Sequence, residues 1–398
     1  MKQIIPLLFE KEKNMIGKMG KNITFISSFK KSECGIASYT QDLIAALGKS
    51  DDSNRLSVLG VETIPHRSTH LSSKIKQVIK TDSVASYIDA AEFVNNSDTD
   101  LIHLEHEFGL FSGTDGENIL AFTEKLNKPF IITFHTVLTN PSYNQKRIIS
   151  NLANSSRKII VMAESARLNL VSIYGIDPKK ITRIPHGVPK INIGHGNDKK
   201  ILGYENKWMI STFGLINSGK GIEYIISALG KIKNEIPNVV FLVIGKTHPK
   251  IILSEGERYR KSLVLMVKAM GLENNVIFID RYLSQKELLS YLKATDIYIS
   301  AYLEPQQVIS GTLAYALGAG KPCISTPYLY AQEVLANGRG VMVPFRNSQK
   351  IRDEIVNLIK NPKMLKSFSK KAYEFSRPML WENVCLAHLG LYREILKT

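Results

Sequence analysis

The sequence is poor in cysteine, in long apolar segments and in acidic residues. Its 398 residues include three cysteines, Cys34, Cys323 and Cys385, which lie far apart and form no close pair of the zinc-binding kind. This sparse, odd set excludes a disulfide-rich secreted scaffold and favours a reducing compartment. No apolar run reaches the ~20 residues that a membrane-spanning helix needs. We therefore expect a cytoplasmic protein.

Acidic residues are outnumbered by basic ones. There are 36 Asp and Glu against 52 Lys and Arg, a formal net charge of +16. The basic residues are spread along the chain without an Arg-rich or aromatic-rich stripe, which argues against nucleic-acid recognition. The charge fits an anionic substrate or peripheral contact with an anionic membrane. An ordinary solvated, lysine-rich surface explains it equally well.

Apolar strand-like runs alternate with helical patterns, and the series restarts once. Runs at 22–29, 55–61, 100–107, 129–135, 158–163 and 180–187 precede a polar segment at 191–207, and runs at 208–215, 239–246, 275–280, 297–302, 321–326 and 340–345 follow it. Strand–helix alternation predicts parallel sheets covered on both faces. We therefore predict an α/β protein of two doubly wound domains that face a central cleft.

The domains are expected at 21–195 and 196–375, after an N-terminal extension at 1–20 and before a last segment at 376–398. In the extension the apolar piece is too short for the core of a signal peptide. Met15 or Met19 is an alternative start.

The segment "GLINSGKG" (214–221) is one residue away from a P-loop. Gly214, Gly219 and Lys220 have the P-loop spacing, but Gly221 stands where Ser or Thr would bind magnesium. The segment follows a strand and opens a helix, a place that favours phosphate. We therefore expect a nucleotide diphosphate held by Lys220 and backbone amides, without an essential metal. The alternative is a glycine-rich turn with a surface lysine.

Two other turns carry glycine between a strand and a helix. In "SSFKKSECGIASYT" (27–40) Gly35 begins a helix, and an ordinary tight turn is the more frequent explanation. In "QQVISGT" (306–312) the last three residues, Ser310, Gly311 and Thr312, lie at a helix N-terminus and form a second candidate anion site. The alternative for them is a helix N-cap.

Acidic and histidine residues follow several of these strands. Glu304 is expected on a strand end, where it suits hydrogen bonds from sugar or ribose hydroxyls. His135 ends the strand "PFIITFH", although a single histidine is more often structural. In "HLEHEFG" (103–109) strand alternation separates His106 from His103, Glu105 and Glu107, and this weakens a metal site.

The segment "DTD" (98–100) resembles the metal-binding Asp-x-Asp of some sugar transferases, but it precedes a strand and is expected to be a turn. We predict no metal site.

Several of these segments, in this order, resemble glycosyltransferase family 4, also called glycosyl transferases group 1. They are "CGIASYT", "HLEHEFGLF", "FHTVL", "PHGV" (185–188), "FGLINSGKGIEYIISAL", "ALGAGKPCIST" and "GRGVMVPF". The resemblance covers roughly residues 22–395. It implies the GT-B fold and a retaining, nucleotide-sugar-dependent enzyme. The segment 376–398 is then a terminal helix that crosses back to the first domain.

The resemblance implies transfer of a hexose from a donor of the GDP-mannose or UDP-glucose type to a glycan or a lipid-linked acceptor. The nucleotide sugar is a substrate, and no cofactor is implied. A non-catalytic nucleotide-sugar-binding protein and a GT-B epimerase or phosphorylase remain alternatives.

The functional positions of the family carry over unevenly. Lys220 matches the phosphate-binding lysine, His135 the histidine that contacts the donor sugar, and Gly35 the glycine turn near the diphosphate. The resemblance also places Arg281 near a loop that approaches the base or phosphate, and it gives Glu107 a contact with acceptor or sugar hydroxyls.

Three positions depart from the family pattern. Leu215 replaces an arginine, and Gln307 and Tyr315 replace a pair of glutamates, for one of which Glu304 is a candidate substitute.

Overall fold

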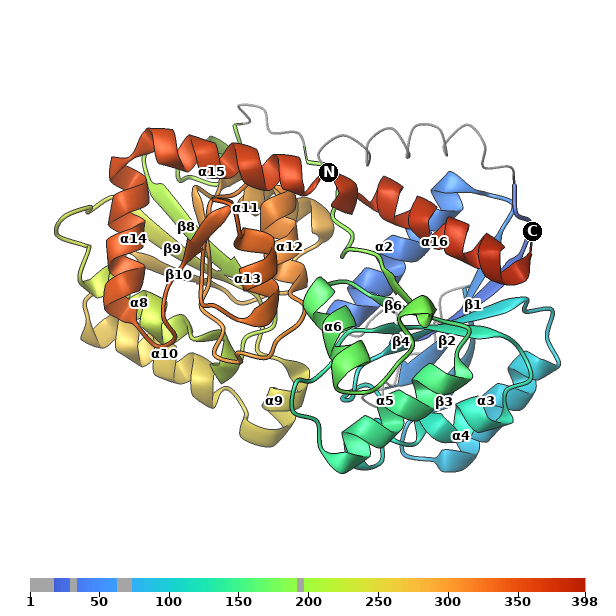
Figure 1. Cartoon of the computed structure of the whole chain (residues 1–398). Coiled ribbons are helices and arrows are strands. Elements are labelled where there is room, and N and C mark those ends of the chain that lie inside the picture. The colour runs from blue at the N-terminus through green and yellow to red at the C-terminus, as the bar shows by residue number, and fades with distance from the viewer. Residues whose placement is uncertain (1–17, 29–33, 63–73, 192–196, 398) are drawn as a thin grey trace. The chain divides into compact units, whose positions relative to one another are not determined.

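The computed structural model describes residues 18–28, 34–62, 74–191 and 197–397, so most of the expected N-terminal extension lies outside it. The chain divides into two compact units. Unit 1 comprises Met1–Gly187 together with Met379–Thr398, and unit 2 comprises Val188–Pro378 (Figure 1).

Unit 1 contains a seven-stranded parallel sheet of order β3-β2-β1-β4-β5-β6-β7. Its strands are β1 (Asn22–Ser27), β2 (Arg55–Glu62), β3 (Ile75–Lys80), β4 (Leu101–His106), β5 (Phe130–Phe134), β6 (Lys158–Val161) and β7 (Ile181–Arg183). The central strands are almost wholly buried, as expected where helices cover both faces of a parallel sheet.

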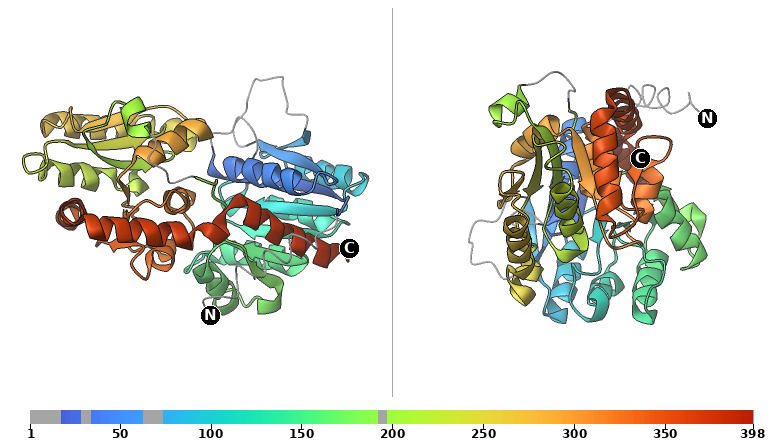
Figure 2. Two further views of the ribbon diagram at one scale, coloured as in Figure 1. Left: turned by 90° about the horizontal axis from the view of Figure 1, so that it is seen from above. Right: turned by 90° about the vertical axis from the view of Figure 1, so that its left-hand side faces the viewer.

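The helices of unit 1 form two groups on the sheet. They are α2 (Gly35–Ser50), α3 (Val84–Asn95), α4 (Ile119–Lys125), α5 (Tyr143–Ser155), α6 (Glu164–Ser172) and α16 (Trp381–Leu396), with short turns η1 (Thr114–Gly116), η2 (Pro178–Lys180) and η4 (Arg377–Met379). Helix α16 packs on α2, and α3, α4 and α5 pack in succession. Figure 1 shows these two groups on opposite faces of the sheet, and in both Figures 1 and 2 α16, in red, runs along unit 1.

Unit 2 contains a six-stranded parallel sheet of order β10-β9-β8-β11-β12-β13. Its strands are β8 (Trp208–Phe213), β9 (Val239–Ile244), β10 (Val276–Ile279), β11 (Ile297–Ser300), β12 (Cys323–Ser325) and β13 (Gly340–Met342). Its helices are α7 (Asp198–Ile201), η3 (Ser218–Lys220), α8 (Ile222–Gly230), α9 (Pro249–Glu255), α10 (Arg258–Ala269), α11 (Gln285–Ala294), α12 (Gly311–Gly318), α13 (Leu329–Leu335), α14 (Ser348–Lys360) and α15 (Pro362–Phe375).

Local chemistry explains where several helices begin. Ser142 starts α5 and Ser284 starts α11 with reciprocal capping boxes, through Gln145 and Glu287 respectively.

Helix α2 buries a stripe of residues spaced three and four apart, namely Ala37, Thr40, Leu43, Ile44 and Leu47. The core of unit 2 unites β9 and β11 with the buried faces of α8 and α14.

The strand order places one reversal in each sheet. The order reverses between β1 and β4 in unit 1 and between β8 and β11 in unit 2. Ligands of doubly wound sheets bind at the carboxyl ends of the strands at this reversal. The segments that follow these four strands are therefore the first places to look for a site.

The predicted α/β class and doubly wound topology are confirmed, and the expected strands occur in the expected order. Strand β3 was not predicted, because this edge strand carries Lys76, Gln77 and Lys80 among its apolar residues. The segment 98–100 lies between α3 and β4, where Asp98 pairs with Arg55 and Asp100 accepts the backbone N–H of Asn22. Among the described helices, none combines the length and the apolar character needed to cross a membrane.

Gly187 fixes how closely the chain passes the start of α16. A Cβ atom on Gly187 would lie 2.2 Å from Cε3 of Trp381. The Trp381 ring is itself held between Tyr39 and His186, with ring centroids at 5.3 and 6.3 Å. A methyl group at this position therefore has no free volume to occupy.

We predict that Gly187→Ala lowers the free energy of unfolding by about 1–3 kcal/mol, the usual cost of overpacking. The matched control is Gly390→Ala in the middle of α16, where an added Cβ meets nothing within 4 Å. That change should stabilise the protein by roughly 0.5–1 kcal/mol. Chemical denaturation of both variants measures the difference, and equal stabilities would contradict the packing described here.

Candidate functional site

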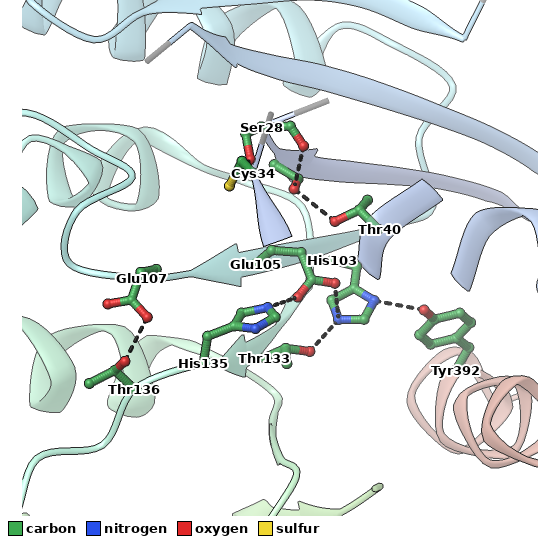
Figure 3. Close-up of polar contacts among 11 residues, drawn as sticks. Ser28, Cys34, Thr40, His103, Glu105, Glu107, Thr133, His135, Thr136 and Tyr392 are labelled. Carbon is green, nitrogen blue, oxygen red and sulfur yellow. Dashed lines mark hydrogen bonds and ion pairs between the residues drawn. The ribbon is translucent and has the colours of Figure 1, made fainter. Parts of the chain in front are cut away.

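A buried carboxylate and a histidine meet at the carboxyl ends of β4 and β5 in unit 1. Glu105 lies on β4 and is fully buried, and His135 directly follows β5 and is 7% exposed. Nε2 of His135 lies 2.7 Å from Oε2 of Glu105 (Figure 3). With Glu105 ionised, the Nε2–H group of His135 donates to it, and Nδ1 is left as the acceptor of the ring.

Two more side chains and the C-terminal helix complete this network. Nε2 of His103, also on β4, lies 2.7 Å from Oγ1 of Thr133 and 3.5 Å from Oε1 of Glu105. Nδ1 of His103 lies 2.7 Å from the hydroxyl of Tyr392, which α16 supplies. Figure 3 shows this order of side chains, from Tyr392 through His103 to Glu105 and His135. We call these four residues and Thr133 the unit 1 network.

Burial sets the electrostatics of the unit 1 network. It raises the pKa of Glu105, while the hydrogen bond and the charge of His135 act in the opposite direction. Burial also holds the pKa of His103 well below its usual range, helped by the neighbouring His388 and His135. His103 is therefore neutral at physiological pH and carries a single ring N–H.

Glu107 and His106 lie at the end of β4 beside this network. Glu107 follows β4, and its carboxylate accepts the Thr136 hydroxyl at 2.6 Å and the backbone N–H of Phe108 at 3.0 Å. His106 points to the other face, as strand alternation predicted, and lies among Phe108, Phe111 and Phe134. Burial, with His135 nearby, lowers the pKa of His106 to about 3. Within the described ranges no three His, Cys, Asp or Glu side chains are grouped so as to hold a metal ion.

An aromatic group borders His135. The Tyr39 ring, on α2, lies edge-on to the rings of His135 and His186, with both centroid distances at 5.2 Å. The Tyr39 hydroxyl is buried and has no hydrogen-bond partner among the described residues. Burial, and then the charge of Glu105, raises the pKa of Tyr39 well above its usual range.

Gly35 is the first residue of α2, as predicted. The cap position before it, Cys34, makes no side-chain cap hydrogen bond, and the first turn of α2 holds no acidic residue. The start of this helix therefore keeps the partial positive charge that favours an anion.

The second group of residues lies at the carboxyl ends of β8 and β11 in unit 2. Lys220, in η3, donates from Nζ to the hydroxyl of Tyr302 at 2.5 Å. That hydroxyl also lies 2.7 Å from Oγ1 of Thr312. Gly214, directly after β8, adopts φ +123°, and a Cβ there would lie 3.2 Å from Thr312 and 3.9 Å from Nζ of Lys220. We call these four residues the unit 2 cluster.

Glycine is required where the loops of the unit 2 cluster meet. Gly221 starts α8 with a left-handed backbone, and a Cβ there would lie 2.2 Å from the carbonyl oxygen of Ala301. The backbone N–H of Leu303 donates to Gly219 at 2.9 Å. The loop after β8 therefore lies directly against the loop after β11, and this contact sets the position of Lys220.

Charge also shapes the unit 2 cluster. Burial opposes ionisation of Tyr302, but the charge of Lys220 and its hydrogen bond outweigh it, so the pKa of Tyr302 is lowered. His248 precedes α9, and its Nδ1 accepts the backbone N–H of Lys250 at 3.2 Å. Burial and the charges of Lys250 and Lys220 lower the pKa of His248. His248 is therefore a neutral neighbour of Lys220 at physiological pH.

The remaining predicted residues of unit 2 have mixed outcomes. Ser310 is the N-cap of α12 and accepts the N–H of Leu313 at 3.3 Å, so the capping alternative is confirmed for it. Gly311 and Thr312 begin α12 as predicted. Arg281 follows β10 and pairs with Glu287 at 2.6 Å.

The prediction that Glu304 lies at the end of a strand was wrong. Strand β11 ends at Ser300, and Glu304 is exposed in the loop beyond it. Its carboxylate accepts the backbone N–H of Gln306 at 2.9 Å and so stabilises the turn at 305–306. Gln307, at the family glutamate position, donates to the carbonyl of Ile309.

No prediction from the sequence covered Tyr302, His248 or the pairing of Glu105 with His135. Tyr302 and His248 follow β11 and β9 closely, so their position after buried strands was an available signal. Glu105 was noted only as one member of a histidine- and glutamate-rich strand. Its partner depends on the register in which Glu105 lies beside Thr133.

We predict that Lys220→Met moves the ionisation of Tyr302 to higher pH, because the variant removes the charge that lowers this pKa while burial remains. Ultraviolet absorbance of the phenolate, recorded against a Tyr302→Phe reference, measures the titration. Lys231→Met, at an exposed position after α8, is the control for general charge loss. An unchanged titration in Lys220→Met would contradict the contact between these side chains.

The chain matches two family models and several known proteins. The models are Glycosyltransferase Family 4, over residues 35–190, and Glycosyl transferases group 1, over residues 196–375. The uncharacterized glycosyltransferase MJ1069 of Methanocaldococcus jannaschii is 26% identical over 239 residues. That match spans 59% of this chain and 57% of the relative, so it falls short of two thirds of the relative's length.

Solved structures share the fold over nearly the whole chain. Sucrose-phosphate synthase from Thermosynechococcus elongatus has a TM-score of 0.77 at 15% identity, covering 95% of this chain and 99% of that one. HepE of Anabaena, in complex with UDP and glucose, has a TM-score of 0.72 at 15% identity, covering 95% and 100%. With both family models matched in order and two parallel doubly wound sheets, the chain belongs to the group 1, family 4 glycosyltransferases of GT-B fold.

Proposed function

We propose that this glycosyltransferase transfers a hexose, with retention, from a nucleoside diphosphate sugar of the UDP-glucose or GDP-mannose type. The acceptor is a hydroxyl group of a glycan or of a lipid-linked sugar. The observation that carries the proposal is the unit 2 cluster, in which a lysine is held beside two glycine-rich turns at the reversal of the sheet. HepE, which shares the fold, was solved with UDP and glucose, and this supports the choice of donor class.

Unit 2 is proposed to bind the nucleotide diphosphate. Lys220 is bound to a phenol rather than to a carboxylate, so a diphosphate competes for its ammonium without breaking an ion pair. The backbone N–H groups at the start of α12, Gly311 and Thr312, add donors for the same anion. Gly214 and Gly219 leave room for the phosphates, and Arg281 lies after β10 as a candidate contact for the base or phosphate.

Unit 1 is proposed to supply the contacts to the sugar and the acceptor. His135 offers Nδ1 to a sugar hydroxyl, because Glu105 occupies Nε2. Gly35 leaves the N-terminus of α2 accessible to phosphate oxygens. Glu107, held by Thr136, is proposed to accept a hydroxyl of the sugar or the acceptor.

The proposed chemistry needs no protein nucleophile. The acceptor hydroxyl attacks the anomeric carbon from the face that the leaving diphosphate vacates, and the diphosphate takes the proton of the acceptor. The protein then contributes position and charge stabilisation, in which Lys220 neutralises the charge that grows on the leaving group. No metal is assigned to this step, because Lys220 and the amides of α12 supply the positive charge in the proposal.

The net charge of +16 supports an anionic acceptor or one presented at an anionic membrane. Sedimentation with vesicles containing anionic lipid checks the membrane version of this proposal, which requires binding that falls as salt rises.

We predict that Lys220→Ala lowers kcat by about 10²–10³, the usual loss on removing one transition-state donor. The control is Lys231→Ala, which removes the same charge from an exposed position that bonds Ser348 and Gln349. Steady-state transfer assays with both variants give the comparison. Near-normal turnover in Lys220→Ala would exclude the proposed role of this lysine.

We also predict that one nucleoside diphosphate raises the thermal midpoint of the protein, with and without EDTA. A panel of UDP, GDP, ADP and their sugars identifies the donor nucleotide. The shift should vanish in Lys220→Ala and persist in Lys231→Ala. A shift lost in EDTA would overturn the metal-free proposal.

If a donor binds without transfer to any acceptor, the protein is a binding protein on the GT-B fold. Interconversion of the donor without an acceptor would identify an epimerase instead.

A further inference from the structure

The unit 1 network links the C-terminal helix to His135 through two hydrogen bonds and one longer contact. Its hydrogen-bonded contacts are Tyr392 to His103 and Glu105 to His135, each at 2.7 Å, and the two pairs are joined by the 3.5 Å approach of His103 to Glu105. Tyr392, His103 and Glu105 are completely buried. In such a buried site the neighbouring side chains decide which ring nitrogen of His103 carries the proton.

Two proton arrangements satisfy the contacts of His103. In the first, Tyr392 donates to Nδ1, and the Nε2–H group of His103 faces Thr133 and Glu105. In the second, Thr133 donates to Nε2, and Nδ1–H donates to Tyr392. Each arrangement leaves one hydroxyl hydrogen without a partner in the network, so counting hydrogen bonds does not separate them.

The carboxylate of Glu105 decides between the two arrangements. Oε1 of Glu105 lies 3.5 Å from Nε2 of His103 and has no hydrogen-bond partner among the described residues. In the first arrangement this oxygen faces the positive end of an N–H dipole. In the second it faces a lone pair, which is repulsive in a buried site where electrostatic interactions are strong. The first arrangement is therefore favoured.

We propose that Tyr392 and His103 are positioning residues for His135. Tyr392 holds His103 in its Nε2–H form, and that N–H group supports the charge on Glu105. The charged Glu105 in turn holds His135 in its Nε2–H form, which leaves Nδ1 as the acceptor for a sugar hydroxyl. The C-terminal helix thus determines which ring nitrogen of His135 donates a hydrogen bond and which one accepts. The last step rests on the proposed function, whereas the state of His103 does not.

The proposal also concerns pH, because Glu105 must be ionised. The titratable groups around Glu105 and its two histidines come from five parts of unit 1. They are His103 on β4, His135 after β5, His186 after β7, Tyr39 on α2, and His388 and Tyr392 on α16. Burial lowers the pKa of His186 and of His388 to about 4, so both are neutral at physiological pH. Burial likewise holds the pKa of Tyr39 and of Tyr392 well above its usual range. Burial raises the pKa of Glu105, so Glu105 is the carboxylate of this network whose charge is lost as the pH falls.

The test is Tyr392→Phe in the full-length protein, labelled with ¹⁵N at histidine. Nitrogen shifts report the tautomer of each ring, and single His→Gln variants assign His103 and His135. We expect both histidines in the Nε2–H form in the wild type, and loss of this single form at His103 in Tyr392→Phe. His103 in the Nδ1–H form in the wild type would overturn the proposal, whether or not the protein transfers sugar.

Two further variants separate this role from a loss of packing. Tyr87→Phe removes another buried hydroxyl of unit 1, which accepts the N–H of Ser112 at 3.4 Å, and should leave the His103 signals unchanged. Thr133→Val should also leave His103 in the Nε2–H form, because Tyr392 still donates to Nδ1. A switch of His103 to the Nδ1–H form in Thr133→Val would show that Thr133, as the acceptor of Nε2–H, holds the tautomer instead of Tyr392, and would overturn the proposal.

The kinetic consequence is measured once a donor and an acceptor are known. Tyr392→Phe should lower kcat roughly tenfold, the scale on which outer hydrogen-bond partners affect the residues they orient. KM for the nucleotide sugar should change little. The acid limb of the kcat profile should move to higher pH, because Glu105 is protonated more readily without the support of His103. An unmoved acid limb, or an equal effect in Tyr87→Phe, would contradict the positioning role.

Discussion

The buried carboxylate of Glu105 is the constraint around which unit 1 is organised. Removing an ionised group from water costs several kcal/mol even after relaxation, so such a group persists only where donors surround it. His135 supplies a direct hydrogen bond and His103 an N–H dipole, and both depend on the parallel register of β4 and β5. The C-terminal helix α16 also contributes to this site, because its Tyr392 is the hydrogen-bond partner of His103 on β4.

In unit 2 the charged group that the fold must hold in place is a cation, the ammonium group of Lys220. Lys220 lies where the backbone of two loops meets, and Gly221 and Gly214 are required there because a Cβ would collide with or crowd the neighbouring loop. The partner of Lys220 is the phenol of Tyr302, a weaker acceptor than a carboxylate. The loop therefore keeps its cation in place without neutralising it.

Local patterns predicted the strands and Lys220, and contacts distant in sequence explain what was missed. Parallel strands buried on both faces appear as continuous apolar runs, so β4, β5, β8 and β9 were found, whereas the polar edge strand β3 was not. Lys220 was predicted because its glycine motif is contiguous. Its partner Tyr302 lies 82 residues further along the chain, and only the sheet order brings the two together. Glu304 was predicted at the end of a strand, but it lies in the loop after β11. The sequence alone does not show where β11 ends, so the two positions could not be distinguished.

The two sets of contacts differ in how readily a ligand can replace them. Glu105 is fully buried, and its hydrogen-bond partner His135 belongs to the same compact unit. Displacing His135 would therefore leave the carboxylate of Glu105 buried without its hydrogen bond. Lys220 is bound to a neutral hydroxyl that has a second partner in Thr312, so releasing it leaves no buried group unpaired. A diphosphate offers this lysine a stronger, charge-assisted bond than the phenol does. The network in unit 1 is therefore suited to hold one fixed hydrogen-bonding polarity through a catalytic cycle, and the cluster in unit 2 is suited to exchange its partner in every cycle.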